Sequence, residues 1–371
     1  MVRRRCYAIV GIVLTFCAAT DAQSPGWTQR FVSGPAPRNN MAMSFDSGRG
    51  RSVMFGGVDA AQHYGETWEW DGTNWTLAST TGPVPRYGPA LAYDSARART
   101  VLFGGHMDNR VAIGDTWEWD GAAWTFRSMD GPMPRNNHAM AYDSLRGRTV
   151  LFGGQDHELM YQDDTWEWDG NIWTQVGIGG PAPAARATHA MAYDSVRGRT
   201  VLFGGSDGAN QLGDTWEWDG TTWEQRSNGG PSPRAAIAIA YDSATARVVQ
   251  FGGEGSVDTW EWSGSAWTRR STSGPPLRVF YPMAYDSVHD RVVLFGGYNG
   301  GYLGDTWEYR GIRLGDMNLD GKVDGADISL FISALLTSPT DSTKVYLGDF
   351  NSNNVLDLSD VSGFVTALLA N

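Results

Sequence analysis

The chain has 371 residues, of which 41% are hydrophobic and 19% are charged, and it contains 47 glycines and 17 tryptophans. This length allows one large domain or two unequal ones, and this composition is typical of many short strands joined by tight turns. The formal net charge of −12 argues against a nucleic-acid-binding protein, because such proteins normally present a basic face.

The first residues have the pattern of a secretory signal peptide. Three arginines at 3–5 precede an apolar run from Tyr7 to Ala19, and small residues stand near Ala22. We predict a signal peptide over 1–22 and a secreted protein, extracellular or associated with the cell surface. An N-terminal membrane anchor is the alternative, although the apolar run is short for a bilayer. Both cysteines, Cys6 and Cys17, lie in this segment, so the mature chain is predicted to have no disulfide and no cysteine ligand.

The next 290 residues or so consist of six internal repeats. A Gly-Gly pair begins at 56, 104, 153, 204, 252 and 296, with spacings between 44 and 51. Each repeat has four pieces, best seen at 138–174: HAMAYDS, RTVLFGG, DTWEWDG and NIWTQ. Short apolar segments separated by regular turn signals predict a unit of four antiparallel strands.

A period near 50 with four strands per repeat predicts the blades of a β-propeller. We therefore predict an all-β, six-bladed β-propeller over 23–312. The last repeat, DTWEYRGIRL, lacks a fourth strand, whereas the stretch GWTQRFVSGPAPR near the N-terminus matches fourth-strand text. We expect Trp27 and Thr28 to supply the missing strand and to close the ring. The Gly-Gly pair and the downstream tryptophan of strand three resemble the kelch-repeat family.

The motif DTWEWDG recurs in every repeat, and this repetition favours a scaffold over a sugar platform or a catalytic acid. Alternating strand residues place both tryptophans on one face, where they are expected to pack between blades. Two charged sets also occur once per blade. We expect the turn aspartates, from Asp46 on, to pair with arginines five residues later, such as Arg51. We expect the glutamates, from Glu69 on, to pair with the connecting arginines, such as Arg38.

A binding site is expected in the loops between Gly-Gly and the third strand, because there the six copies differ in length and content. Such loops lie on one face of a rigid scaffold, where binding residues concentrate. Two further histidines are expected near the axis of the ring. The candidates are His63, Tyr64, His106, Asp108, His138, Asp156, His157, Tyr161, His189, Asn210, Tyr298 and Tyr302. No pair of histidines has close metal spacing, and we predict no catalytic residue.

After Arg310 tryptophan disappears, and 313–371 is predicted to be a separate module with two calcium loops. DMNLDGKVDGAD and DFNSNNVLDLSD place oxygen ligands at alternate positions, which suits a hard cation with six or seven ligands. We predict two calcium ions. The expected ligands are Asp316, Asn318, Asp320, the Lys322 carbonyl, Asp324 and Asp327 in the first loop, and Asp349, Asn351, Asn353, the Val355 carbonyl, Asp357 and Asp360 in the second.

Each loop continues into an apolar helix, ISLFISALL or VSGFVTALL, and the duplicated loop-helix unit resembles the dockerin type I family. The resemblance implies a small α-helical, EF-hand-like module that binds calcium and docks onto a cohesin-like or cell-surface protein. Loop positions 10 and 11 often contact the partner in that family. Here these positions are Gly325, Ala326, Leu358 and Ser359, and Gly-Ala departs from the hydroxyl-bearing residues common there.

Three functions remain open from the sequence. We favour a secreted, non-enzymatic binding protein whose variable face binds a protein or glycan and whose C-terminal module docks in a calcium-dependent way. The alternative is a polysaccharide-acting enzyme, of glycoside hydrolase or lyase type, although no unique pair of carboxylates suits that reaction. A third is a surface-structural protein. Nucleic-acid binding and a stable membrane span after signal cleavage are not expected.

Overall fold

A computed structural model describes residues 26–107, 111–319, 322–337, 342–350 and 355–369. The chain divides into two compact units, one comprising Pro25–Arg313 and the other containing Leu314–Asn371. The predicted signal peptide lies outside the described residues. Among the described residues, no helix is long and apolar enough to cross a membrane.

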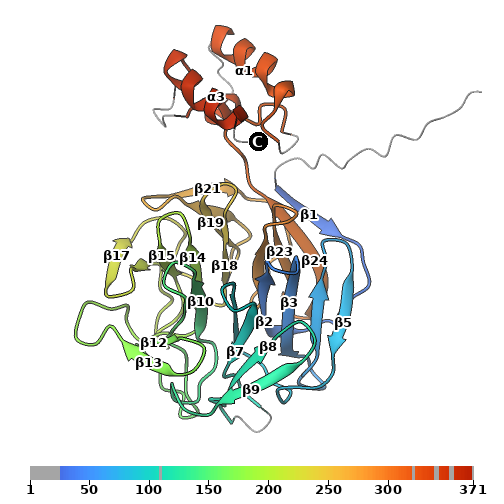
Figure 1. The fold of residues 1–371 in the computed structure, drawn as a ribbon, viewed down its shortest axis with the longest axis vertical. Helices are drawn as coiled ribbons and strands as arrows, with labels where there is room; N and C mark the ends of the chain where they lie inside the picture. Colours follow the sequence, from blue (N-terminus) through green and yellow to red (C-terminus); the bar gives the residue numbers. More distant parts are fainter. Residues whose placement is uncertain (1–25, 108–110, 320–321, 338–341, 351–354, 370–371) are drawn as a thin grey trace, which may run out of the picture. The chain divides into compact units, whose positions relative to one another are not determined.

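The unit Pro25–Arg313 is a six-bladed β-propeller, as predicted. Six antiparallel four-stranded sheets surround a central axis (Figure 1). Blades one to three contain β2 (Asn39–Asp46), β3 (Arg51–Val58), β4 (Thr67–Trp70) and β5 (Trp75–Ser79); β6 (Ala90–Asp94), β7 (Arg99–Phe103), β8 (Thr116–Trp119) and β9 (Trp124–Ser128); and β10 (Ala139–Asp143), β11 (Arg148–Phe152), β12 (Thr165–Trp168) and β13 (Trp173–Val176). Blades four to six contain β14 (Ala190–Asp194), β15 (Arg199–Phe203), β16 (Thr215–Trp218) and β17 (Trp223–Ser227); β18 (Ala238–Asp242), β19 (Arg247–Phe251), β20 (Thr259–Trp262) and β21 (Trp267–Ser271); and β22 (Met283–Asp286), β23 (Arg291–Tyr298), β24 (Tyr302–Arg310) and β1 (Gly26–Arg30).

The N-terminal strand closes the ring, as the sequence predicts. β1 pairs antiparallel with β24, from Gly26 opposite Arg310 to Arg30 opposite Thr306. The indole nitrogen of Trp27 donates to Thr259 Oγ1 in blade five at 2.8 Å. An equivalent bond, at 2.8–2.9 Å, joins each of the remaining five pairs of neighbouring blades: Trp75 to Thr306, Trp124 to Thr67, Trp173 to Thr116, Trp223 to Thr165 and Trp267 to Thr215. Six equivalent bonds therefore run around the propeller, and Trp27 supplies one of them.

The tryptophans of DTWEWDG are scaffold. The second tryptophan of the motif is at most 1% exposed in all five blades that have it, and it packs against the adjacent blade: Trp70, Trp119, Trp168, Trp218 and Trp262. Its indole NH reaches the glutamate of the preceding blade in four of them, for example Trp262 to Glu217 at 3.0 Å. The repeated motif thus holds blades together, because each indole both fills the interface and bonds across it.

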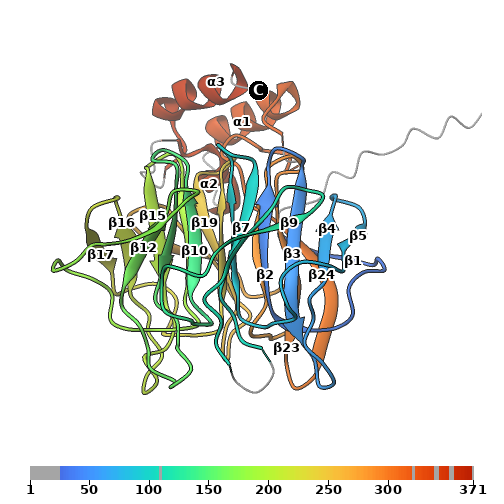
Figure 2. The ribbon, with the colours of Figure 1, turned by 60° about the horizontal axis from the view of Figure 1, so that its bottom comes forward.

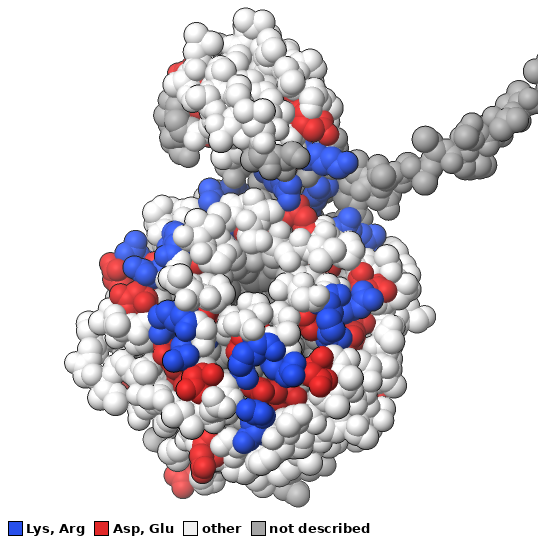
Figure 3. Space-filling model, in the orientation of Figure 1, with Lys and Arg blue, Asp and Glu red and all other residues white. Residues whose placement is uncertain are grey.

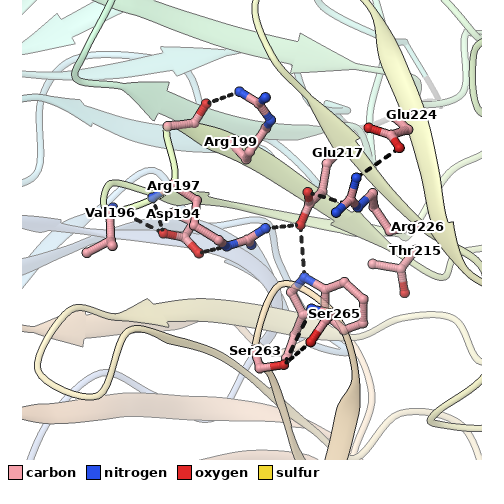
Figure 4. A network of polar contacts seen from close by, with 12 residues as sticks. Asp194, Val196, Arg197, Arg199, Thr215, Glu217, Glu224, Arg226, Ser263 and Ser265 are labelled. Carbon is pink, nitrogen blue, oxygen red and sulfur yellow. Dashed lines mark hydrogen bonds and ion pairs between the residues drawn. The ribbon is translucent and has the colours of Figure 1, made fainter. Parts of the chain in front are cut away.

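The two predicted sets of ion pairs exist with different partners, so both pairing hypotheses are wrong in detail. In four blades the turn aspartate pairs with the arginine three residues later, because a tight turn brings positions i and i+3 together. The same arginine reaches the glutamate of the third strand. Figure 4 shows the fourth blade, where Arg197 lies between Asp194, at 2.7 Å, and Glu217, at 2.6 Å. The arginines five residues after the turn, such as Arg199, instead donate mainly to neighbouring backbone carbonyls.

The connecting arginines are buried and pair with the acid that opens the third-strand motif, rather than with its glutamate. They are at most 2% exposed, and each also donates to the carbonyl of the first Gly-Gly glycine of its blade. The pairs, at 2.5–2.8 Å, are Arg38–Glu66, Arg86–Asp115, Arg135–Asp164, Arg186–Asp214, Arg234–Asp258 and Arg278–Asp305. A buried guanidinium needs such a partner, since an uncompensated buried charge is costly.

Blade five departs from this pattern, and the departure gives a testable prediction. Thr245 stands where four blades have arginine, and the adjacent Asp242 is 3% exposed. Burial, together with the nearby Asp290 carboxylate, raises the Asp242 pKa to about 6. The charged Asp242 carboxylate therefore lowers the free energy of unfolding above pH 6. The cost is about 3 kcal/mol, at about 1.4 kcal/mol per pKa unit, and it disappears below the unfolded pKa of about 4, where the carboxyl group is protonated in both states.

Asp242→Asn is therefore expected to raise the free energy of unfolding by up to about 3 kcal/mol at pH 8, and by little at pH 4. The amide keeps the oxygen that accepts from the Ala244 and Thr245 backbone nitrogens. The matched control is Asp194→Asn, which removes the charge that pairs with Arg197 and should lower the free energy of unfolding of the propeller by about 1–3 kcal/mol. Urea unfolding at both pH values measures the effect; equal signs for the two variants at pH 8 would contradict it.

The unit Leu314–Asn371 is helical in its described part. It contains α1 (Gly325–Thr337), α2 (Ser342–Gly348), the 3₁₀ turn η2 (Leu358–Asp360) and α3 (Val361–Leu369). Its core is small and aromatic: Phe331 and Phe364 stack with ring centroids 3.8 Å apart, and Phe350 meets both edge-on. A core of this size supplies little stability alone.

Candidate binding face

The variable loops project together from one side of the propeller, at the bottom of Figure 2. The Gly-Gly pair sets their starting point. Gly104 and Gly105 have φ values of +67° and +107°, and a Cβ on Gly104 would stand 2.6 Å from the Arg135 carbonyl of the next blade. Only glycine fits this close approach in this conformation, which explains why the pair recurs while the loop after it varies.

A continuous ring of backbone hydrogen bonds surrounds the axis on this face. One residue per blade adopts a left-handed conformation, with φ between 53° and 64°, and its NH donates to the carbonyl of the equivalent residue in the preceding blade at 2.7–3.1 Å. The six residues are Asn40, Gly88, Asn137, Thr188, Ala236 and Phe280. They surround a shallow pocket of about 110 Å³. The ring fixes the blades where the variable loops converge.

His138 and His189 line this pocket, near the axis as the sequence suggests, but both side chains are buried. Each is 5% exposed, and each ring packs edge-on against a phenylalanine of the preceding blade, His138 on Phe103 and His189 on Phe152. Tyr281 occupies the same repeat position and donates to the Phe251 carbonyl. Burial lowers the pKa of His138 to about 3 and that of His189 well below its usual value, so both imidazoles are neutral.

An aromatic cluster joins blades one and two on the same face. His63 stacks on Tyr87 with ring centroids 5.1 Å apart, and the Tyr87 hydroxyl lies 3.0 Å from His106 Nδ1. His106 is 5% exposed, and burial together with the nearby His63 lowers its pKa. Both histidines were among the residues predicted from the sequence, whereas Tyr87 was not. The available signal was its repeat position, where the other blades have asparagine, alanine or valine.

Exposed aromatic and apolar side chains lie on the variable loops of blades three and six. Tyr298 and Tyr302 face each other across the β23–β24 hairpin with ring centroids 5.3 Å apart, and Tyr298 is 37% exposed. The loop of blade three exposes Leu159 and Met160, by 55% and 59%. His157, also exposed, belongs to that loop.

The other candidates mostly support their own loops. Tyr64 is buried beneath the Arg38 guanidinium at 3.5 Å, and its hydroxyl donates to Asp59. Asp156 is buried and accepts from the Glu158 and Met160 backbone nitrogens. The remaining three divide as follows: Tyr161 is half-buried against Gly208, Asn210 is exposed in a turn that Asp207 caps, and Asp108 lies outside the described residues.

The opposite face differs in character. Charged side chains of both signs surround a central hollow in Figure 3. The channel mouth on the side of the strand-one turns has a volume of about 310 Å³ and is lined by repeated residues such as Met140, Tyr142 and Tyr193. These residues recur from blade to blade, so this face carries little information that could select a ligand.

The predicted calcium loops have the same local geometry twice. Asp327 and Asp360 close the loops and are fully buried, and each accepts two backbone NH groups of its own loop: Asn318 and Asp324 donate to the first, Phe350 and Asp357 to the second. Asp316 and Asp349, which open the loops, are also buried. Within the described ranges, no group of three His, Asp or Glu side chains is arranged to hold a metal. Asp320, Asn351 and Asn353 lie outside them.

The helices of this unit expose a regular apolar stripe. Ile328, Ile332 and Leu336 of α1 are 41–81% exposed, and Val365 and Leu369 of α3 are 45% and 83% exposed. The α3 pair stands 33 residues after Ile332 and Leu336, the same offset as between the two loops. All four docking candidates are exposed. Gly325 and Ala326 belong to the first loop, and Leu358, which is 82% exposed, and Ser359 belong to the second.

Residues 121–263 match the family model described as the KLHDC2/KLHL20/DRC7 Kelch-repeats domain, a span that runs from the end of blade two into blade five. A comparison with curated proteins found no match. The matched residues are thus similar to kelch repeats, which agrees with the β-propeller fold of this unit.

Proposed function

We propose that the protein is a non-enzymatic interaction protein whose propeller binds a partner protein through its variable face. The observation that carries this proposal is the exposure of Tyr298, Leu159 and Met160 on loops where the six blades differ. Tyrosine and methionine are enriched at protein interfaces, and clustered exposed apolar groups mark interaction surfaces. A glycan ligand is the finer alternative on the same face, supported by the Tyr298–Tyr302 pair.

The C-terminal unit is proposed to dock separately onto a cohesin-like or cell-surface protein. Its support is the duplicated apolar stripe of α1 and α3, which presents the same side chains twice at a fixed offset. A helix face of this kind fits a groove in a partner. An exported location, inferred from residues 1–22, forms part of the proposal.

Calcium is proposed as the ion of this unit. Four buried carboxylates in two short loops would be costly without a compensating cation, and their oxygens are the ligands that calcium prefers. Asp316, Asn318, Asp324 and Asp327 would hold the first ion together with Asp320 and the Lys322 carbonyl. The second loop offers the corresponding set from Asp349 to Asp360.

Partner capture tests the variable face. The full chain would be immobilised and exposed to a surface fraction of the source cells, in parallel with the double variant Tyr298→Ala/Tyr302→Ala. The control is Leu145→Ala/Val196→Ala, which removes two side chains exposed by 79% and 70% on the strand-one turns. We expect the tyrosine variant to lose the captured protein and the control to retain it. Equal capture by all three proteins would contradict the proposal.

Removal of calcium is expected to unfold the C-terminal helices and to leave the propeller folded. With chelator, the helical circular dichroism signal should fall, and the same loss should follow from Asp327→Ala/Asp360→Ala in the presence of calcium. Asp207→Ala, which removes an exposed turn carboxylate of the propeller, is the control. An unchanged helical signal and no calorimetric binding of calcium to the wild-type chain would contradict the assignment.

A further inference from the structure

The seam of the propeller differs from its other five blades in its chain path. In blades one to five a WDGxxW or WSGxxW turn joins the third strand to the fourth. In blade six that turn is missing, because β24 ends at Arg310 and β1 begins at Gly26, directly opposite. A pocket of about 250 Å³ lies at this break, lined by Trp27, Arg270, Ser271, Ser273, Tyr309 and Ile312.

Two side chains at the seam are smaller than their equivalents in the other blades, at Tyr309 and at Gly26. Tyr309 stands where the other blades have tryptophan, so a phenol ring replaces a larger indole. Its hydroxyl still reaches Glu261 of the preceding blade, at 3.0 Å, and thereby keeps the bond that the indole NH makes elsewhere. Gly26 stands where the other blades have asparagine, alanine, isoleucine or threonine, and a Cβ on it would meet no atom within 4 Å. The structural contact is thus preserved while volume is released.

The walls of the pocket combine aromatic faces with hydroxyl groups. The rings of Trp27 and Tyr309 lie 5.2 Å apart at 44° to each other. Ser271 and Ser273 also line the pocket, and their hydroxyl oxygens lie 3.2 Å apart. The guanidinium of Arg270 contributes donors, and its charge is balanced by Glu261, since Arg270 Nε is 2.7 Å from Glu261 Oε2. The lining is therefore polar and aromatic with no net charge.

We propose that this seam pocket binds a neutral pyranose unit of a glycan. A pyranose has C–H faces that pack on aromatic rings and hydroxyls that exchange hydrogen bonds with serine and guanidinium groups. The balanced charge of Arg270 disfavours an anion or a cation. The volume is below the 300–1,000 Å³ of pockets for drug-sized ligands, which suits a single ring. This site is distinct from the variable face and does not depend on the proposed function.

The test is titration of the full chain with D-glucose, D-galactose, D-mannose and D-xylose, followed by saturation-transfer NMR and calorimetry. Ser273→Trp places a large ring in the pocket. Thr81→Trp is the matched control, since Thr81 has the same exposed position in blade one and the same turn bond, Thr81 N to Ser79 Oγ at 3.1 Å against Ser273 N to Ser271 Oγ at 3.0 Å.

We expect at least one of these sugars to bind the wild-type chain, Ser273→Trp to weaken that binding at least tenfold, and Thr81→Trp to leave it unchanged. Thermal unfolding should show that both variants remain folded. The proposal is overturned if none of the four sugars binds, or if the two variants bind the sugar equally. Neither outcome affects the variable face, because both variants leave its loops intact.

Discussion

Truncation of the chain to begin at Phe31, which removes β1, is expected to destabilise the propeller more than any other change considered. The deletion removes a five-residue strand pairing with β24 and the Trp27 indole, which packs on Phe251 and Tyr309 and bonds to Thr259. Loss of a tryptophan from such an interface alone costs about 3 kcal/mol. Blade six would also expose a new strand edge, which favours aggregation.

Urea unfolding of the propeller, followed by tryptophan fluorescence, measures this effect. The control is Phe31→Ser. The Phe31 side chain follows the strand directly and is 88% exposed, so its removal should change the free energy of unfolding by less than about 0.5 kcal/mol. Trp27→Ala should reproduce most of the loss. A truncated chain with the wild-type urea midpoint would show that the ring does not depend on β1.

Acid is expected to weaken the propeller through His138 and His189. The folded pKa of His138, about 3, lies below the usual value of 6.5, so the folded protein binds fewer protons than the unfolded chain between these values. Stability is therefore complete above about pH 6.5 and falls as the pH drops toward 3. At pH 4 the loss from His138 is about 3 kcal/mol, and His189 acts in the same direction.

The variant His138→Met/His189→Met should lose less stability than wild type between pH 7 and pH 4. Methionine fits this repeat position, since Met41 occupies it in blade one against Gly296. Asp242 titrates in the same window with the opposite sign, so the comparison is between variant and wild type rather than between pH values of one protein. Identical pH profiles for the two proteins would contradict the assignment of neutral buried histidines.

The scaffold was predictable because repetition is a constraint that sequence displays directly. The Gly-Gly pair appears six times, the paired tryptophans of the third strand appear in five blades, and the strand at Trp27 completes the sixth blade. The ion pairs were predicted less well, since their partners depend on turn geometry: Asp194 pairs with Arg197 across the turn, and Arg199 points elsewhere. Spacing alone does not distinguish i+3 from i+5.

The candidate site was predicted as a region more successfully than as a set of residues. Loop variation indicated the correct face, but it gave no information on burial, so Tyr64 and Asp156 were selected although both support their loops. Tyr87 was missed because it precedes a first strand rather than following a Gly-Gly pair. The seam pocket depends on the absence of one turn, which only the closed ring brings into view.

Hydrogen–deuterium exchange on the full chain, with and without a protein captured by the propeller, tests the central claim most directly. If the repeated motif is scaffold and the variable loops bind, protection should appear in the loops that contain Leu159, Met160, Tyr298 and Tyr302. Peptides from the strand-one turns, such as those containing Leu145 and Val196, should exchange at the same rate in both states. Protection confined to those turns would place the partner on the opposite face and contradict the account.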